Sequence, residues 1–482
     1  MKTRVTLPGG FAMVGINLTV GKSVGKYNSI SGWTIAFSVA AMSAIAQADP
    51  RQTQQDAEQA LDAGDPATAA GVAQDLLTAA PDSFAGLMLR ALAQSNLNDM
   101  AGAAATGRLA YRAAPDDATR LQAARLTAAA HFQQGQFARA EIWLRRASNH
   151  ARTPDEADTV ARDYRSAAQA NPLSIQTTAS IAPSSNINNG SVDGILSFEG
   201  IDLQLQLPED QRALSGITYA GSVRLGYRLS RDERQATTAG LLLSGATYSL
   251  SRDARALLDA SPIARVQGLT GHDFRSFRAE AGLTHTRGDL SPLGPVSATL
   301  DFGGYWEGGV HLVNYRALTL QQGIPYGPDG RFTLTGSTQR QDAVSATVVD
   351  AVTHDVSAAY NLRLANRDQM QLTLAARHRD GGFENIYDEY RAWVGYAFER
   401  PILGTRLSTG VEIGYRHYDT FPTTLDGRRD RFASVTGTAV LDRFTTFGFA
   451  PTLTTKATRT LSTANEYTTS VVEIGIGIQS TF

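Results

Sequence analysis

The chain has 482 residues, enough for two or three domains with sizeable cores. Charged residues make up 19%, the formal net charge is -2 and cysteine is absent. This composition excludes a polybasic nucleic-acid binder and a fold held together by disulfides. A mean hydropathy of -0.20 still allows a membrane β-barrel, because only alternate residues of each strand face lipid.

The amino-terminal segment has the features of a secretory signal peptide. An apolar run at 33–45 follows Lys22 and Lys26 and precedes an A-x-A site at 46–48. A basic region, a short apolar stretch and a small-residue site in this order predict export, with cleavage before Asp49. The apolar run is too short for an ordinary transmembrane helix.

After this segment alanine dominates, and apolar residues recur at helical spacing as far as residue 171. Two units end in Ala-Pro-Asp, and their prolines, Pro81 and Pro115, stand 34 residues apart, which is the period of tetratricopeptide (TPR) helix pairs. The repeats predict turns at 63–65, 96–99 and 134–136, each followed by a small-residue helix, and a last helix at 154–170.

TPR stacks bind peptides or proteins on a concave face. Four residues of the expected helices are candidates for contact with a client protein or peptide: Tyr111, Arg112, His131 and Arg139. The alternative is that each of them is an ordinary solvated or packed helix residue.

From residue 173 onward alanine falls, while Gly, Thr, Tyr and Phe rise. In the last stretch Val472, Ile474, Ile476 and Ile478 alternate with polar residues and glycine before the terminal Phe482. Such alternation predicts β-strands with one apolar and one polar face. Fourteen segments of this kind are predicted, beginning near Ser174, Ile217, Ala239, Phe274, Val296, Val310, Phe332, Val356, Gln369, Tyr387, Arg406, Arg431, Phe447 and Tyr467.

The connections between these segments alternate in length. Several even-numbered connections are short, as at 230–235 and 364–368, whereas several odd-numbered ones are long, as at 184–216 and 251–272. Outer-membrane barrels have short periplasmic turns and longer external loops, whereas a soluble sandwich has no reason for this alternation. The polar strand face would line a wet lumen, for which the candidates are Arg224, Arg228, Asp301, Glu307, Glu412 and Arg416.

The sequence therefore predicts an α + β multidomain protein, in which N-terminal TPR-like α-helical repeats precede a transmembrane antiparallel β-barrel of about 14 strands. The expected domains are a signal peptide at 1–48, a periplasmic helical domain at 49–172 and an outer-membrane barrel at 173–482. To close the barrel, the strands near Ser174 and Tyr467 have to pair. The small, threonine-rich stretch at 177–182 leads to the hypothesis that this seam is weak and opens laterally.

Two stretches make the chain similar to the surface lipoprotein assembly modifier (Slam) family. The first strand runs into S-N-I-N-N at 185–189, which is similar to a stretch at the end of the family's first barrel strand. The region from Pro451 to Phe482 is similar to the family's closing hairpin, although Ser462 and Asn465 are farther apart here than the family pattern has them.

The resemblance implies a translocon that helps lipoproteins, or soluble haem- or metal-acquisition proteins, reach the cell surface. Its partners would be the client, a periplasmic chaperone, outer-membrane lipid and the barrel-assembly machinery. It implies no catalytic residue, no cofactor and no metal. Asn186, Asn188 and Asn189 are expected either to order the first external loop through side-chain to backbone hydrogen bonds or to contact the client.

Other classes of outer-membrane protein remain as alternatives. An exopolysaccharide exporter also joins TPR helices to a barrel, usually with more repeats, and acidic and aromatic lumen residues such as Asp301, Tyr305, Glu307 and Glu412 would suit a sugar. A passive porin-like channel needs no periplasmic helical domain. An enzyme is not expected, because the sequence contains no G-x-S-x-G or H-E-x-x-H motif. The pairs that come closest to a hydrolase site are His417 with Asp419, and His354 with Asp355.

Overall fold

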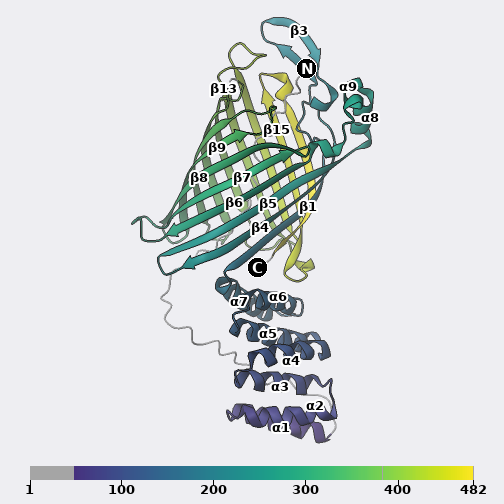
Figure 1. Cartoon of the computed structure of the whole chain (residues 1–482), viewed down its shortest axis with the longest axis vertical. Helices are drawn as coiled ribbons and strands as arrows, with labels where there is room; N and C mark the ends of the chain where they lie inside the picture. The colour runs from purple at the N-terminus through teal and green to yellow at the C-terminus, as the bar shows by residue number, and fades with distance from the viewer. Residues whose placement is uncertain (1–47, 383, 481–482) are drawn as a thin grey trace. The chain divides into compact units, whose positions relative to one another are not determined.

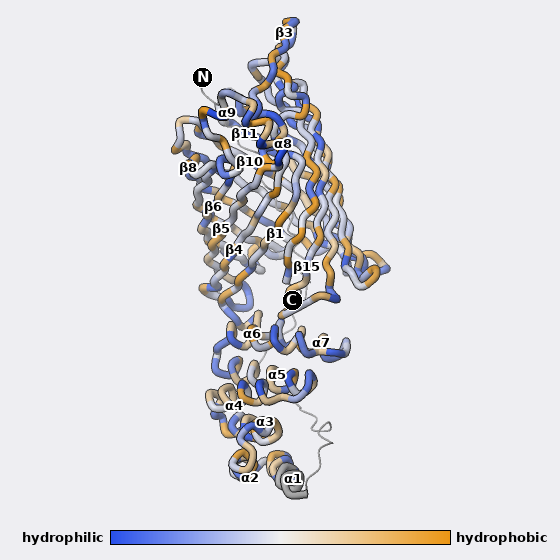
Figure 2. The backbone as a smooth tube through the Cα atoms, turned by 90° about the vertical axis from the view of Figure 1, so that its right-hand side faces the viewer, coloured by the Kyte–Doolittle hydropathy of each residue, from blue (hydrophilic) through white to orange (hydrophobic). Residues whose placement is uncertain are grey.

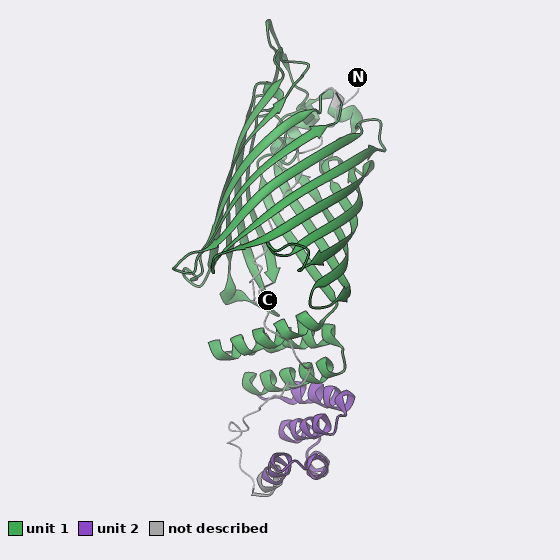
Figure 3. Ribbon diagram, turned by 90° about the vertical axis from the view of Figure 1, so that its left-hand side faces the viewer, with its two compact units in different colours: residues 1–5, 116–482 green, residues 6–115 purple. Residues whose placement is uncertain are grey.

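The structure is a computed structural model that describes residues 48–382 and 384–480 (Figure 1). The predicted signal peptide, apart from Ala48, and the terminal Phe482 lie outside the described residues. The described chain forms two compact units. The first unit along the chain ends at Pro115 and is purple in Figure 3 (unit 2 of its key), and the second begins at Asp116 and is green (unit 1 of its key). The change from helix to strand, after Ala170, lies inside the second unit, so the compact units divide at a different place from the expected domains.

The described part of the chain begins with seven helices, as the TPR-like repeats predict: α1 (Ala48–Asp62), α2 (Pro66–Ala79), α3 (Phe84–Asn96), α4 (Met100–Ala113), α5 (Asp117–Gln133), α6 (Phe137–Ser148) and α7 (Pro154–Ala170). No helix among the described residues is long and apolar enough to cross a membrane. Five of the helices, α2 to α5 and α7, begin at an Asp, Ser or Thr whose side chain accepts a hydrogen bond from the first turn. Thr153 and Glu156 form a capping box at the start of α7, and Asp116 and Thr119 form one at the start of α5.

The turns inside the helix pairs share one backbone geometry. Gly64, Asn98 and Gly135 have φ values of 77°, 62° and 70°, so each turn uses a left-handed residue. Glycine takes this conformation freely, and asparagine is one of the few other residues that tolerate it. Between the turns, small side chains let neighbouring helices approach closely. Alanines such as Ala73 and Ala147 are fully buried.

The second unit contains a closed antiparallel barrel of fourteen strands, as the alternation predicts. Each strand pairs with the next along the chain, and the first pairs with the last. The barrel strands are β1 (Leu173–Ser184), β4 (Gly216–Arg231), β5 (Gln235–Leu250), β6 (Ser276–Arg287), β7 (Val296–Glu307), β8 (Val310–Tyr326), β9 (Gly330–Ala343), β10 (Ala351–Arg363), β11 (Gln369–Asp380), β12 (Tyr387–Ala397), β13 (Arg406–Tyr418), β14 (Arg428–Val440), β15 (Phe449–Ser462) and β16 (Thr469–Ser480).

The odd-numbered connections contain helices and strands that the sequence does not predict. They hold β2 (Ile195–Phe198), β3 (Ile201–Gln206), α8 (Arg252–Ala260), α9 (Pro262–Gln267) and the 3-10 turns η1 (Glu209–Gln211), η2 (Gly271–Phe274) and η4 (Asn465–Tyr467), whereas the turn η3 (Asp442–Phe444) lies in an even-numbered connection. Figures 1 and 2 both show β3, α8 and α9 at one end of the barrel. Ile187, Leu214 and Leu258 form a small core there, which packs the first and third loops together.

The outer wall of the barrel is apolar. Hydrophobic and hydrophilic residues alternate along the strands (Figure 2), and every strand leaves at least one large apolar side chain between 37% and 65% exposed. One from each strand is Ile175, Val223, Leu243, Leu283, Phe302, Leu320, Leu334, Val356, Leu374, Val394, Ile413, Val435, Leu453 and Ile476. Because successive strand residues point to opposite faces, the residues between these positions line the barrel interior.

Candidate functional site

The barrel interior is the candidate site, and its inner wall is charged. On β6 and β8, Arg278, Glu280 and Tyr315 form a closed triangle. The Arg278 Nε–H donates to the Tyr315 Oη over 2.7 Å, the Tyr315 hydroxyl donates to Glu280 Oε2 over 2.8 Å, and Arg278 pairs with Glu280. Each polar group has a partner, so the triangle is stable in a partly buried setting. None of these three residues is among the predicted lumen residues, although all of them lie on inward positions of predicted strands.

Most of the predicted lumen residues lie on inward positions. Asp301 alternates with the exposed Phe302, and Arg224 alternates with the exposed Val223. Glu307 accepts a hydrogen bond of 3.4 Å from the hydroxyl of Tyr305. These groups line the wall between β4 and β7, where β6 contributes the triangle described above.

Glu412 and Arg416 lie on the inward positions of β13, on the other side of the barrel from this wall in strand order. Arg416 is held by the nearly buried Glu389 of β12, to which its Nε–H donates over 2.7 Å. Arg391 also pairs with Glu389, at 3.0 Å. The carboxylate of Glu389 therefore pairs with two arginines: Arg391 on its own strand, and Arg416, which the register of β12 and β13 places opposite it.

Arg228 departs from the prediction. Its Nη2 donates to the main-chain carbonyls of Gln169, Ala170 and Asn171, at 2.8, 3.1 and 2.9 Å. These carbonyls end α7, where the last turn of a helix lacks intrahelical donors and attracts a cation. Arg228 is therefore a cap that fastens α7 to the base of the barrel rather than a side chain of the lumen.

A second inner cluster lies at the end of the barrel that carries the long loops. Arg428 pairs with Asp430 at 2.7 Å, and the exposed fractions of their side chains are only 6% and 2%. The Arg428 guanidinium also lies over the rings of Tyr467, Tyr418 and Phe421, at 3.5, 4.1 and 5.1 Å from their centroids. This cluster, which we name the arginine–aromatic cluster, joins the β13–β14 loop and the turn η4 to the inner wall.

The asparagines of the first loop hold the backbone in place. The Asn186 side chain is buried, accepts from Gly190 N and donates to Gly190 O, both at 2.8 Å, and reaches Ser470 O of β16 at 3.3 Å. Asn188 donates to the carbonyls of Asp210 and Arg212 and accepts from Leu214 N. These contacts match the first of the two expected roles, the ordering of the loop. Asn189 is exposed, with a φ of 53°, and its contact with a client protein stays a prediction.

We predict that Asn186→Ala destabilises the first external loop by about 1–3 kcal/mol, because the buried amide of Gly190 loses its 2.8 Å acceptor and keeps only the Asn188 Oδ1 at 3.4 Å. Limited proteolysis of the purified full chain measures the effect as faster cleavage between β1 and β4. Asn189→Gly is the matched control, since that side chain is exposed and glycine keeps the φ of 53°, so the cleavage rate should stay unchanged. Equal cleavage rates for both variants would contradict the role of Asn186.

The seam between β1 and β16 has the shortest ladder in the barrel. Four residue pairs join these strands: Ala179 with Ile478, Ser180 with Gly477, Ile181 with Ile476, and Ser184 with Glu473. On its other side β1 pairs with β4 along its whole length, from Leu173 to Ser184. The lower half of β1, from Leu173 to Thr178, has no paired residue on β16 among the described residues. The barrel is closed, as predicted, but its closing edge is only partly paired.

The helices α6 and α7 contact the barrel through Arg145. Its guanidinium donates to the carbonyls of Phe447 and Gly448, in the β14–β15 turn, and to the hydroxyl of Ser480 at the end of β16. It also donates to the Tyr164 hydroxyl over 2.7 Å. Burial raises the pKa of Tyr164, so this hydroxyl stays protonated and donates to Glu141 in turn. The closing strand is therefore tied to the last helices of the repeat region.

The predicted client-binding residues fall on both units. In the second unit, the carboxamide oxygen of Gln136 lies 2.9 Å from the His131 Nδ1 and accepts from Arg139 over 2.8 Å, so these two candidates converge on the turn between α5 and α6. In the first unit, Tyr111 is half-buried and Arg112 is exposed, near the end of α4. Their role in client binding stays a prediction.

The histidine–aspartate pairs have different geometries. His354 is exposed on the outer wall, whereas the neighbouring Asp355 faces inward and pairs with Arg377 at 2.7 Å, so these two side chains do not form a pair. The His417 Nε2 lies 3.4 Å from Asp419 Oδ1, with Asp419 well exposed. Within residues 48–382 and 384–480, no group of three or more acidic or histidine side chains is arranged to hold a metal ion.

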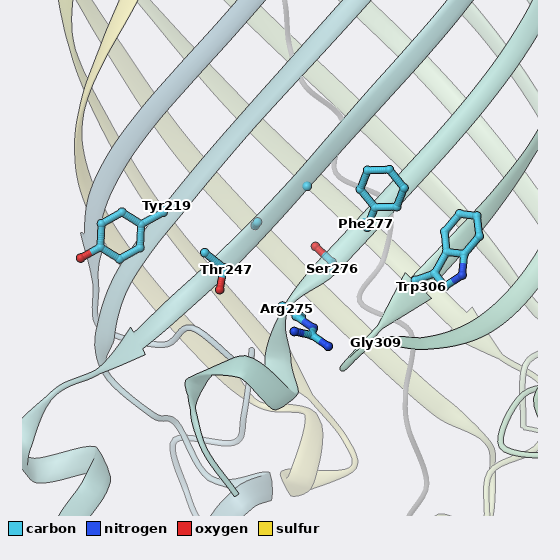
Figure 4. A pocket seen from close by; sticks show the side chains of 9 residues that line it. Tyr219, Thr247, Arg275, Ser276, Phe277, Trp306 and Gly309 are labelled. Atoms are coloured by element: carbon cyan, nitrogen blue, oxygen red, sulfur yellow. The ribbon is translucent and has the colours of Figure 1, made fainter.

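A shallow hollow of about 300 Å³ lies at the rim of the barrel, between β4 and β7 (Figure 4). The rings of Tyr219, Phe277 and Trp306 line it, together with the side chain of Arg275. Gly245 creates the space, because a Cβ there would lie 2.8 Å from the carbonyl oxygen of Ser276. Aromatic side chains at the end of an apolar wall are typical of the girdles of membrane barrels.

In comparisons with solved structures, the helical part and the barrel of this chain are each similar to different proteins. No protein-family model and no curated protein matches the chain. The helical part is similar to the TPR2B domain of yeast Sti1 in complex with a pHsp70 peptide, with 20% identity over 25% of this chain and 96% of that one, at a TM-score of 0.23. The barrel is similar to the outer membrane protein OmpT of Vibrio cholerae, with 8% identity over 64% of this chain and 99% of that one, at a TM-score of 0.32. It is also similar to the COG4313 outer membrane channel of Pseudomonas putida, with 14% identity over 64% and 95%, at 0.32.

These likenesses are too low to transfer any activity, and the class of protein follows from the fold itself. The chain joins a TPR-like helical region to a closed antiparallel barrel of fourteen strands, with an apolar outer wall and a charged interior.

Proposed function

We propose that the chain is an outer-membrane translocon that delivers lipoproteins, or secreted acquisition proteins, to the cell surface. The apolar outer wall, present on all fourteen strands, supports insertion in a membrane, because so large an exposed apolar surface is costly in water. The strands pair only within the chain and close on themselves, so no unpaired sheet edge meets lipid along most of the circumference.

The connections support the orientation. β1 follows α7 directly, so the end of the barrel where β1 begins also holds the even-numbered connections, such as 232–234 and 327–329. Short connections are periplasmic in outer-membrane barrels. On this account the helices lie in the periplasm, and the long connections 185–215 and 251–275 lie outside the cell. The alternation is not strict, because the odd-numbered connections 308–309, 381–386 and 463–468 are shorter than the even-numbered connections 288–295, 398–405 and 441–448.

The observation that carries the proposal is the union of three features in one unit: the last TPR-like helices, the charged barrel interior and the partly paired seam. Arg145 ties α6 to the end of β16, so a client bound by the helices would be held at the closing strand. The polar wall can accommodate a polar chain, and the seam offers a lateral exit for a lipid anchor. The similarity of 185–189 to the Slam stretch points to the same function. On this account no bond is made or broken, and the chain needs no cofactor.

A polysaccharide exporter is the second candidate, favoured by the acidic and aromatic side chains of the inner wall, which include Glu280, Asp301, Tyr305, Glu307 and Tyr315. Such residues suit hydrogen bonding and stacking with sugars. In the structure, however, Glu280 and Tyr315 are already bonded to Arg278 and to each other. The wall is therefore less available to a sugar than its composition implies.

A surface-proteolysis experiment tests the proposed function. The gene is deleted, intact cells are treated with protease, and mass spectrometry compares shaved peptides with total protein. We expect one or a few lipoproteins to lose their shaved peptides while their total amounts persist, with rescue by the intact gene. An unchanged lipoprotein surface, together with loss of extracellular polysaccharide, would favour the exporter instead.

A further inference from the structure

Three arginines stand together on the outer wall of the barrel, at the end that carries the long loops. Arg429 and Arg431 are alternate residues of β14, and Arg459 lies on the neighbouring β15. The register pairs Arg459 with Ala433 and Arg431 with Leu461, so Arg431 and Arg459 are diagonal neighbours. Diagonal neighbours and alternate residues of a strand are each about 7 Å apart. We name these three residues the arginine triad.

The arginine triad faces outward, not into the lumen. Arg428 and Asp430, the residues that flank Arg429, are buried inside the barrel, whereas all three arginines are exposed. On the same face, Val435 and Leu453 belong to the apolar outer wall, at 53% and 41% exposed. The arginines therefore stand on the membrane-facing wall, next to the loop end of its apolar band.

The arginine triad has no counter-charge. None of its members forms an ion pair with any residue that the structure describes. Other outward arginines differ: Arg316 and Arg340 lie opposite each other across β8 and β9, and both pair with Asp342, at 3.5 and 3.1 Å. A protein can balance outward arginines with its own carboxylate, as it does on β9, and on β14 and β15 it does not.

We propose that the arginine triad binds the phosphate groups of a lipid in the outer leaflet. Three guanidinium groups spaced over neighbouring strands match a headgroup with more than one phosphate, and guanidinium binds phosphate through paired N–H donors. The apolar wall next to them receives the acyl chains. This inference rests on the outer-membrane part of the proposed function, and it adds a bound lipid beside the closing seam, one strand away from β16.

A lipid bound to the arginine triad would also affect the seam between β1 and β16. β15 is the strand that pairs with β16, and Arg459 pairs in the ladder with Ser470 of β16. A lipid held at Arg459 would lie against the outer surface of the closing strand, at the loop end, where β1 still pairs with β16 through Ser184 and Glu473. Bound lipid would therefore support the paired end of the seam.

Lipid binding to the purified full chain tests this inference directly, without any export assay. Native mass spectrometry in detergent counts bound molecules of diphosphorylated lipid A for the wild type, the triple variant Arg429→Gln, Arg431→Gln, Arg459→Gln, and the control Arg316→Gln, Arg340→Gln. The triple Lys variant keeps the charges but not the paired donors. Heat-modified gel mobility shows whether each variant is folded.

We expect the triple Gln variant to lose at least tenfold in apparent affinity, the Lys variant to lose less, and the paired control to keep its affinity. Inorganic phosphate at the same concentration should not displace the lipid, and dephosphorylated lipid A should bind as weakly to the wild type as the phosphorylated lipid binds to the Gln variant. Equal losses for the Gln variant and the control, or displacement by inorganic phosphate, would overturn the inference. If the Gln variant does not fold, the inference is tested by the Lys variant and by dephosphorylated lipid A. Unchanged affinity in both cases would overturn it. Loss of export with normal lipid binding would count against the proposed function alone.

Discussion

A disulfide across the seam should stop surface delivery. In the variant Ala179→Cys, Ile478→Cys the two cysteines face each other across the short β1–β16 ladder. Opposite residues of an antiparallel pair have Cα atoms about 4.5–5.5 Å apart, within the range that a disulfide bridges. The chain has no other cysteine, so no competing bond forms. If clients leave laterally, oxidised cells should show at least a tenfold loss of shaved lipoprotein peptides, and a reductant should restore them.

The control for this lock places the same bond in a complete ladder. Leu453→Cys, Ile476→Cys links β15 to β16, where Leu453 and Ile476 are register partners. Both disulfides face outward, since Ile478 is 50% and Ile476 is 65% exposed, so neither narrows the lumen. We expect the control to deliver normally. Full delivery by the oxidised seam variant would exclude the lateral exit, and equal loss in both variants would show only that a bond on β16 is harmful.

The arginine–aromatic cluster should be the part of the barrel most sensitive to loss of a charge. Asp430→Asn removes the ion-pair partner of Arg428, and this nearly buried guanidinium then has no ion pair among the described residues. Removing one member of a buried pair costs about 3–5 kcal/mol, whereas an exposed pair is worth less than about 1 kcal/mol. We therefore expect the free energy of unfolding of the full chain in lipid vesicles, measured with urea, to fall by about 3 kcal/mol.

Asp342→Asn provides the matched control, because it removes a carboxylate that pairs with two arginines but is 40% exposed. Its effect on the free energy of unfolding should stay below about 1 kcal/mol. A double change, Arg428→Met with Asp430→Leu, should recover most of the loss, since it removes both charges. If Asp430→Asn costs no more than Asp342→Asn, the cluster is not a buried ion pair in the working protein.

The barrel could be predicted from the sequence because each strand shows its own alternation. Val296, Val310, Gln369, Tyr387 and Arg406 begin strands at the predicted residues. β5 begins at Gln235 rather than near Ala239, because its first residues, Gln-Ala-Thr-Thr, have no apolar face that marks a strand. The helices α8 and α9 were not predicted, because each is too short to show a clear helical periodicity.

The candidate site was harder to predict, because its contacts depend on pairing between segments far apart in sequence. Alternation places Arg416 on the inward face but does not show Glu389 beside it, since that contact depends on the register of β12 and β13. Arg228 has the parity of a lumen residue, yet the carbonyls of α7 take up its donors. For Asn186 the sequence predicts hydrogen bonds to the loop backbone as one of two roles, but its partner Gly190 and its burial depend on the folded loop.

We propose that this barrel carries a protein client across a membrane, and purified components test this transport directly. The full chain is reconstituted in liposomes whose helical units face outward, a client lipoprotein identified by the shaving experiment is added with a periplasmic chaperone, and external protease is applied afterwards. The account predicts that client becomes protected from protease only in liposomes that contain the chain, and that the oxidised seam variant abolishes this protection. Client that remains fully digestible, while the same liposomes take up a polysaccharide, would contradict it.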